Sequence, residues 1–273
     1  MSHTPPSVSV ITVVKNGGVG FMSTARSILA QTAASFEWVV KDCLSVDGTA
    51  ESALALKDPR LRFVSAHDSG IYDGMNQALR LATGRYVHFL NAGDWYLQPW
   101  VLARFEELVR KQHDAALIVC SHWNQRRDVT IRYPSQPNRF YLYRRCFCHQ
   151  AVFFSAELLA DVGAFDTSLR AKADHDLILR CLKASGRPPV VVPEQWIGYE
   201  GGGFTDQKKR RYLLDVESAE VHRRHFSRTE RVLFRAVQEA TLWRVRRIIA
   251  EQERCSSVRS LYQKVKTLLN RIY

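Results

Sequence analysis

The chain of 273 residues is long enough to bury a substantial core, and 46% hydrophobic with 24% charged residues is typical of a globular protein. No apolar run reaches the roughly 18 residues that a membrane-spanning helix needs, and the start of the chain lacks the basic segment of a signal peptide. The net charge is +12, and six scattered cysteines favour free thiols over a disulfide framework. We therefore expect a cytoplasmic protein.

Strands and helices alternate through the first half of the chain. Short runs rich in β-formers predict buried strands over residues 8–14, 36–41, 61–65 and 86–90. Apolar residues at helical spacing predict helices over residues 21–31, from Asp47 onward, and over residues 72–82. This alternation predicts βαβ units and a mostly parallel sheet, so the first half is expected to be a nucleotide-binding half-domain.

The second half continues the pattern less regularly. Strands are expected over residues 115–121, 149–154 and 190–192, with an exposed strand near Val129. Helices are expected over residues 99–112 and 155–162, and a further helix begins near Asp174. The sheet is therefore expected to extend into this half.

Carboxylates gather around the predicted strand at residues 86–90. Asp68, Asp73 and Asp94 fall within 27 residues, and the segment Asn91-Ala92-Gly93-Asp94 follows the strand immediately. Open α/β sheets bind their ligands at the carboxyl ends of such strands. We therefore expect a functional site there.

A dinucleotide-binding loop is an alternative for the first half of the chain. Gly18-Val19-Gly20 follows the first predicted strand, but Ser23 stands where the third glycine of that motif belongs. No phosphate-binding motif with a lysine is present either. Hydride transfer is therefore disfavoured.

Five segments resemble glycosyltransferase family 2, whose members have the GT-A fold. They are VSVITVVKN, FEWVVKDCLSVDGT, DSGIYDGMNQALRLATGRYVHFLNAGD, CHQAVFFSAEL and GAFDTSLRAKADHDLILRCL, in the family's order. Within the family the chain looks most like bacterial enzymes that build exopolysaccharide, O-antigen or glycolipid glycans. The resemblance implies a Rossmann-like catalytic domain over residues 1–205, with a nucleotide-sugar half to about residue 98 and an acceptor half over residues 99–205.

The resemblance assigns the donor side. Asp42 matches the aspartate that accepts a hydrogen bond from the nucleotide base, and an imide N–H favours uridine. Asp73 matches an aspartate near the ribose and sugar, and Asp94 the last aspartate of the metal motif, which implies Mg²⁺ or Mn²⁺ on the diphosphate. Asn91 is placed with the donor, although it and Gly93 stand where many members carry aspartates. Asp42 as a loop or cap residue, and Asp73 as an acid favoured by the helix dipole, remain alternatives.

The resemblance also assigns the acceptor side. Asp174 matches the catalytic base of these inverting enzymes, and its partly apolar surroundings are expected to raise its pKa. The alternative is that Asp174 only caps the helix, a role that Asp176 could fill instead. His149 and Gln150 match a segment that lines the acceptor side, although a core histidine is an equal alternative.

The last quarter of the chain is strongly basic. Residues 206–273 hold 17 Lys and Arg against 8 Asp and Glu, so most of the net charge lies there. Apolar residues follow helical spacing from Val258 to Ile272, and residues 231–249 mix large apolar side chains with arginines. We predict a basic amphipathic helical tail that binds an anionic membrane surface peripherally, at the inner face of the cell membrane. Packing on the catalytic domain, or on a second subunit of a homo-oligomer, is the alternative.

Together these observations predict an inverting glycosyltransferase. It would move a sugar from a nucleoside-diphosphate sugar, with UDP favoured, to a saccharide or lipid-linked acceptor in bacterial surface polysaccharide or glycolipid synthesis. A sugar nucleotidyltransferase would need a glycine-rich phosphate loop that residues 15–20 only partly provide. A nucleic-acid-binding protein would use the basic tail but leave the aspartates unexplained, so no nucleic-acid partner is expected.

Overall fold

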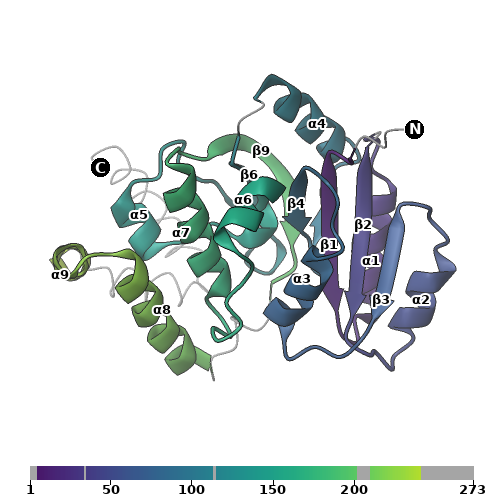
Figure 1. Cartoon of the computed structure of the whole chain (residues 1–273), viewed down its shortest axis with the longest axis horizontal. Helices are drawn as coiled ribbons and strands as arrows, with labels where there is room; N and C mark the ends of the chain where they lie inside the picture. The colour runs from purple at the N-terminus through teal and green to yellow at the C-terminus, as the bar shows by residue number, and fades with distance from the viewer. Residues whose placement is uncertain (1–4, 34, 113–114, 202–209, 241–273) are drawn as a thin grey trace. The chain divides into compact units, whose positions relative to one another are not determined.

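The computed structural model describes residues 5–33, 35–112, 115–201 and 210–240 (Figure 1). The chain divides into two compact units, Met1–Val221 and His222–Tyr273. The predicted boundary near residue 205 falls among residues that are not described, and so does the predicted apolar stripe from Val258 to Ile272. Among the described helices, none is long and apolar enough to cross a membrane.

Within the described residues, nine strands form one sheet. Their order is β3-β2-β1-β4-β8-β6-β9-β5, with β7 beside β6. Figure 1 labels β1 to β4, β6 and β9. Their bounds are β1 Val8–Val14, β2 Phe36–Asp42, β3 Leu61–Ser65, β4 Tyr86–Phe89, β5 Trp95–Tyr96, β6 Leu117–Asn124, β7 Val129–Ile131, β8 Val152–Ser155 and β9 Val190–Tyr199.

The first four strands are parallel. β1 pairs with β2 and β4, and β2 pairs with β3, with Val14 of β1 opposite Asp42 of β2. Because these strands run the same way, their carboxyl ends meet at one edge of the sheet, where Asp42 and the residues after β4 lie. The predicted βαβ arrangement of this half is confirmed.

The second half of the sheet is mixed. β8 lies antiparallel between β4 and β6, whereas β6 and β9 are parallel. The strand predicted over residues 149–154 begins later than expected, because His149–Ala151 form a 3₁₀ turn, η2, before β8. This turn carries His149 and Gln150 at the junction of the two halves of the sheet.

Helices cover both faces of the sheet. Their bounds are α1 Gly18–Leu29, α2 Thr49–Ala55, α3 Ile71–Leu79, α4 Val101–Lys111, α5 Arg139–Arg144, α6 Ala156–Val162, α7 Ala173–Ser185, α8 Arg211–His225 and α9 Arg228–Ala240; a second 3₁₀ turn, η1, spans Gln125–Arg127. α3 packs on β1 and β2, and α6 packs on β8 and α7.

Aromatic side chains fill the core between the sheet and its helices. Phe21 of α1 stacks on Trp38 of β2, whose indole N–H donates to Thr12 Oγ1 over 3.0 Å. Phe153 of β8 stacks on Phe105 of α4 and meets Trp196 of β9 edge to face. These five side chains are almost wholly buried, which fixes the strands that carry the site.

Candidate active site

A tight turn after β4 places Asp94 at the carboxyl edge of the parallel strands. Its backbone N–H donates to the Asn91 carbonyl over 3.0 Å, and Gly93 has φ of +100°, which a side chain would strain. Thr24 of α1 holds the turn, because its hydroxyl donates to the Asp94 carbonyl over 2.6 Å and accepts from Gly93 N–H over 3.0 Å. The Asp94 side chain is therefore fixed in a buried position.

The Asp94 carboxylate joins two other elements. Gln150 of η2 donates to Oδ2 over 2.8 Å, and the backbone N–H of Glu200, just after β9, donates to Oδ1 over 3.1 Å. Burial raises the pKa of Asp94 to about 7, and the negative charge of Glu200 also raises it. The two hydrogen bonds act in the opposite direction and lower the pKa. The structure thus brings the predicted residues Asp94 and Gln150 together.

Glu200 is a site residue that sequence reasoning missed. Its carboxylate lies against Gly93, where a Cβ would overlap Glu200 Oε2. It therefore fills the space beside the turn that an acidic side chain at position 93 would need. Position 200 is 106 residues from Asp94 in the chain, so the only signal was the unusual glycine at position 93.

The atoms around Asp94 suit a hard divalent cation. The carboxylates of Asp94 and Glu200 lie close enough to repel each other, and Asn91 Oδ1 is buried with no hydrogen-bond partner among the described residues. Oxygen atoms of this kind are the ligands that Mg²⁺ and Mn²⁺ prefer. In the described part of the chain, no group of three or more His, Cys, Asp and Glu side chains is arranged to hold a metal.

A chain of polar contacts links Asn91 to Asp174. Asn91 Nδ2 lies 3.1 Å from His149 Nε2, and His149 Nδ1 lies 3.4 Å from Asp174 Oδ2. Because the amide donates to Nε2, the His149 proton sits on Nδ1 and faces the carboxylate. The Tyr72 hydroxyl of α3 donates to Asp174 Oδ1 over 3.3 Å. Predicted donor and acceptor residues therefore form one network.

The expected rise in the pKa of Asp174 is wrong. Burial does act to raise it, but the hydrogen bond from His149, the positive charge of Lys172 and the His175 backbone N–H together lower the pKa. The Asp174 side chain keeps 24% of its surface exposed, so one face stays open to an incoming group. Asp174 is therefore an ionised, accessible carboxylate at neutral pH.

Asp42 and Asp73 lie apart from this network. The wholly buried carboxylate of Asp42 accepts hydrogen bonds from Ser45 N–H, the Ser45 hydroxyl and the Ser65 hydroxyl. The carboxylate of Asp73 accepts from Ser69 and Gln77 at the start of α3, and the Ser69 backbone bond leads in lowering its pKa. Among the described contacts, neither carboxylate bonds to the Asn91–Asp94 turn, and both already serve their loops.

Asp68, the third carboxylate of the sequence cluster, is structural. Its Oδ2 lies 3.1 Å from Lys41 Nζ, and the Lys41 side chain is 1% exposed. Lys41 also donates to the Asp42 and Ala66 carbonyls, so the pair ties β2 to the loop before α3.

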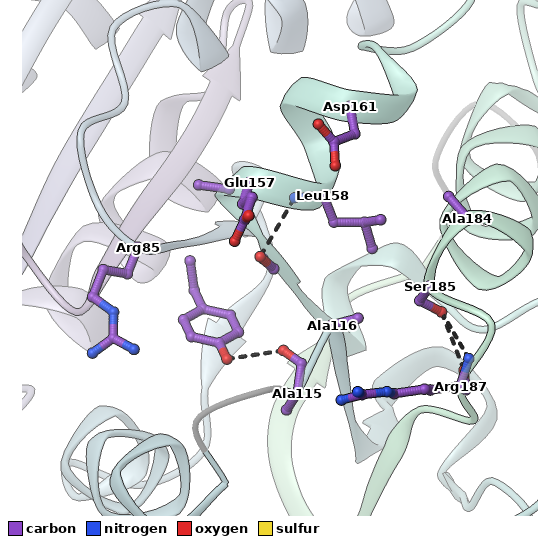
Figure 2. A pocket seen from close by; sticks show the side chains of 12 residues that line it. Arg85, Ala115, Ala116, Glu157, Leu158, Asp161, Ala184, Ser185 and Arg187 are labelled. Carbon is purple, nitrogen blue, oxygen red and sulfur yellow. Dashed lines mark hydrogen bonds between the residues drawn. The ribbon is translucent and has the colours of Figure 1, made fainter.

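A separate cavity of about 620 Å³ lies at the other edge of the sheet (Figure 2). Figure 2 shows Arg85, just before β4, together with Glu157 and Leu158 of α6 and Ser185 at the end of α7. Tyr86, the first residue of β4, lies opposite Ser155, the last residue of the antiparallel β8, and both line the cavity. The cavity therefore lies at the amino end of β4, whereas Asp94 follows its carboxyl end. The cavity contains none of the predicted site residues.

Comparisons with known proteins agree with this arrangement. A sequence model described as glycosyl transferase family 2 matches residues 9–166, from β1 through α6. A Mycobacterium bovis protein named PGL/p-HBAD biosynthesis glycosyltransferase is 30% identical over 186 residues, which cover 64% of this chain and 70% of that relative. An uncharacterized glycosyltransferase of Mycobacterium tuberculosis is 28% identical, over 64% of this chain and 68% of its own.

Two solved structures share the fold. A mannosyltransferase of Pyrobaculum calidifontis, in complex with GDP-Man and Mn²⁺, superposes with a TM-score of 0.64 at 19% identity, over 98% of this chain and 81% of its own. S. aureus TarS in complex with UDP-GlcNAc gives a TM-score of 0.64 at 17% identity, over 79% of this chain and 66% of its own. The expected GT-A fold is confirmed.

Proposed function

The chain belongs to glycosyltransferase family 2, and from this membership we propose that it transfers a sugar, with inversion, from a nucleoside-diphosphate sugar to a saccharide or lipid-linked acceptor. The proposed pathway is synthesis of bacterial surface polysaccharide or glycolipid. One observation carries the proposal. Consecutive residues of the η2 turn contact two carboxylates, since His149 reaches Asp174 and Gln150 reaches Asp94.

Asp94 lies on the proposed donor side. It would hold a divalent cation together with Glu200 and the free carbonyl oxygen of Asn91, and the donor diphosphate and water would complete the coordination. Such a cation offsets the negative charge that builds on the leaving diphosphate. The structure of the P. calidifontis enzyme with GDP-Man and Mn²⁺ supports this assignment by fold.

Asp174 lies on the proposed acceptor side. The acceptor hydroxyl oxygen would bond to the anomeric carbon as the bond from that carbon to the diphosphate oxygen breaks. Its proton would pass to Asp174, which His149 Nδ1–H and the Tyr72 hydroxyl hold in place. Attack from the face opposite the diphosphate inverts the configuration of that carbon.

Asp42 and Asp73 are retained as donor residues in the proposal. Asp42 ends β2 at the edge of the sheet where Asp94 also lies, and it would accept the imide N–H of a uracil base. Asp73 stands in the first turn of α3, next to Tyr72, and would lie near the ribose. TarS with UDP-GlcNAc and the P. calidifontis enzyme with GDP-Man share the fold at the same TM-score, so the preference for UDP rests on the proposed role of Asp42.

The proposed membrane contact falls partly on α9. Val232 and Leu233 of this helix are 64% and 59% exposed, and Arg228, Arg231 and Arg235 lie on the same helix. Each basic residue near an anionic surface adds about 1 kcal/mol of binding free energy. Co-sedimentation with phosphatidylglycerol vesicles tests the contact, and loss of binding in Val232→Asp/Leu233→Asp is expected. Sedimentation equilibrium of the same variant tests the alternative, a homo-oligomer.

The function is tested by screening UDP-, GDP- and dTDP-sugars for donor hydrolysis, with Mn²⁺, with Mg²⁺ and with EDTA. We expect release of one nucleoside diphosphate in the presence of metal, and loss of that release in Asp94→Ala. Asp161→Asn, an exposed carboxylate on α6, is the control and should match the wild type. No release, together with no nucleotide binding by calorimetry, would contradict the proposal.

A further inference from the structure

A buried glutamate on α8 holds the segment that leads into α7. Glu217 is 6% exposed, and its two carboxylate oxygens accept separate backbone bonds. Arg170 N–H donates to Oε1 and Ala171 N–H to Oε2, each over 2.8 Å. Bonds from backbone N–H to an ionised carboxylate are among the stronger hydrogen bonds in proteins.

The held segment leads directly to the proposed base. Ala171 is followed by Lys172, the residue before α7, and Asp174 lies in the first turn of the helix. No side chain caps this helix start by a hydrogen bond, so its orientation depends on the chain before it. Ala171 and Ala173 are 3% and 0% exposed, which leaves the segment little room to shift unless its anchor is lost.

We propose that Glu217 is a positioning residue for Asp174. Through the two backbone bonds it sets where α7 begins, and hence where the Asp174 carboxylate stands relative to His149 and Tyr72. This inference rests on the proposed role of Asp174 as base. Glu217 lies beyond the family match at residues 9–166 and beyond the predicted catalytic domain, which ends at residue 205. If it positions Asp174, α8 belongs to the catalytic unit rather than to the tail.

Two further observations agree with this placement. The compact unit that contains the site extends to Val221 and so includes Glu217. The Glu217 charge also contributes to raising the pKa of the Tyr72 phenol, after burial and the Asp174 charge, which puts Glu217 near the hydroxyl that bonds to Asp174.

The test compares Glu217→Gln and Glu217→Ala with Asp215→Asn in the full chain. Glutamine keeps the shape but offers one acceptor oxygen for two N–H groups, whereas alanine offers none. Asp215 is an exposed carboxylate on the same helix, so its variant makes the same change in charge without touching the segment. Hydrogen exchange of the peptide over residues 166–174 is measured with donor affinity and turnover.

We expect both Glu217 variants to speed exchange at residues 170 and 171 and to leave nucleotide affinity unchanged. Because a misplacement of about 1 Å at a reacting group can cost on the order of 100-fold, we expect kcat to fall by about 10- to 100-fold in Glu217→Ala. The fall should be smaller in Glu217→Gln and absent in Asp215→Asn.

Two results would overturn the inference. Unchanged exchange in a folded Glu217→Gln variant would show that the carboxylate does not hold the segment. Faster exchange with wild-type kcat would show that the anchor does not position the base. Failure of the proposed function looks different, because the wild type itself would then turn over no donor while the exchange result would stand.

Discussion

The buried Asp94 carboxyl group should make the free energy of unfolding depend on pH. Its pKa is about 7 in the folded protein, against 3.8 for an unperturbed carboxyl group, and burial is the main cause. The folded state therefore binds the Asp94 proton more tightly than the unfolded state does. Stability from this group is complete below pH 4 and is lost as the pH rises through about 7. Above pH 7 the protein has therefore lost on the order of 4 kcal/mol of unfolding free energy from this group.

Asp94→Asn removes this loss because its amide is neutral at every pH. In EDTA and without nucleotide, we expect the variant to unfold with nearly wild-type free energy at pH 4. At pH 8 it should be more stable than the wild type by on the order of 2–4 kcal/mol, after about 1 kcal/mol for the altered hydrogen bonds. Urea unfolding at both pH values measures the difference, with Asp161→Asn as control.

If the difference in unfolding free energy between the variant and the wild type does not grow from pH 4 to pH 8, the pKa of Asp94 is not raised in the folded protein. The same samples test the cation. Mn²⁺ with UDP at pH 8 should raise the melting temperature of the wild type, since a ligand that binds only the folded state stabilises it. The rise should be smaller in Asp94→Asn, which keeps the proposed base-binding Asp42 but cannot supply an ionised ligand to the cation. An equal rise in both proteins would contradict a cation held by Asp94.

Three further changes have defined outcomes. Lys41→Met removes the ion-pair partner of the largely buried Asp68 carboxylate, which among the described residues keeps only the Gly70 N–H, so urea unfolding should show a loss of about 3–5 kcal/mol, partly restored by adding Asp68→Asn. Thr24→Val removes the bonds that hold the turn before Asp94, which should cost about 1–3 kcal/mol and raise the donor KM; an unchanged KM would contradict that role. Asp174→Asn should lower kcat by about 10²- to 10⁴-fold without weakening donor binding. Because the pKa of Asp174 is lowered, Asp174 stays ionised from pH 8 to pH 5, so an acid limb of wild-type kcat near pH 7 should come from Asp94 and should move to lower pH as the Mn²⁺ concentration rises; an acid limb that Mn²⁺ does not move would contradict this.

The first half of the fold was predictable because local signals determine it. β-branched runs predicted β1 to β4, and helical spacing between them predicted parallel βαβ units. The placement of Asp94 after β4 followed from the same pattern, since the carboxyl ends of parallel strands share one edge. Local patterns predict that a strand forms but not which strands it pairs with. The position of β8, antiparallel between β4 and β6, could therefore not be predicted from the sequence.

The network around the site depends on contacts distant in the chain. Glu200 and Glu217 were not predicted, because nothing in their neighbouring residues indicates that one approaches Gly93 and the other binds the segment before α7. The pKa of Asp174 was predicted in the wrong direction for the same reason. Its apolar neighbours in sequence indicated burial, whereas His149, 25 residues earlier, decides the balance.

Inversion at the anomeric carbon can be measured from the configuration of the first sugar that the enzyme releases from its donor. Proton NMR can follow hydrolysis of the donor found by the screen, before the free sugar equilibrates between its anomers. A single displacement with Asp174 as base predicts that the first sugar released has the configuration opposite to that of the donor, and that Asp174→Asn releases it far more slowly. A first product with the donor's own configuration would contradict the account.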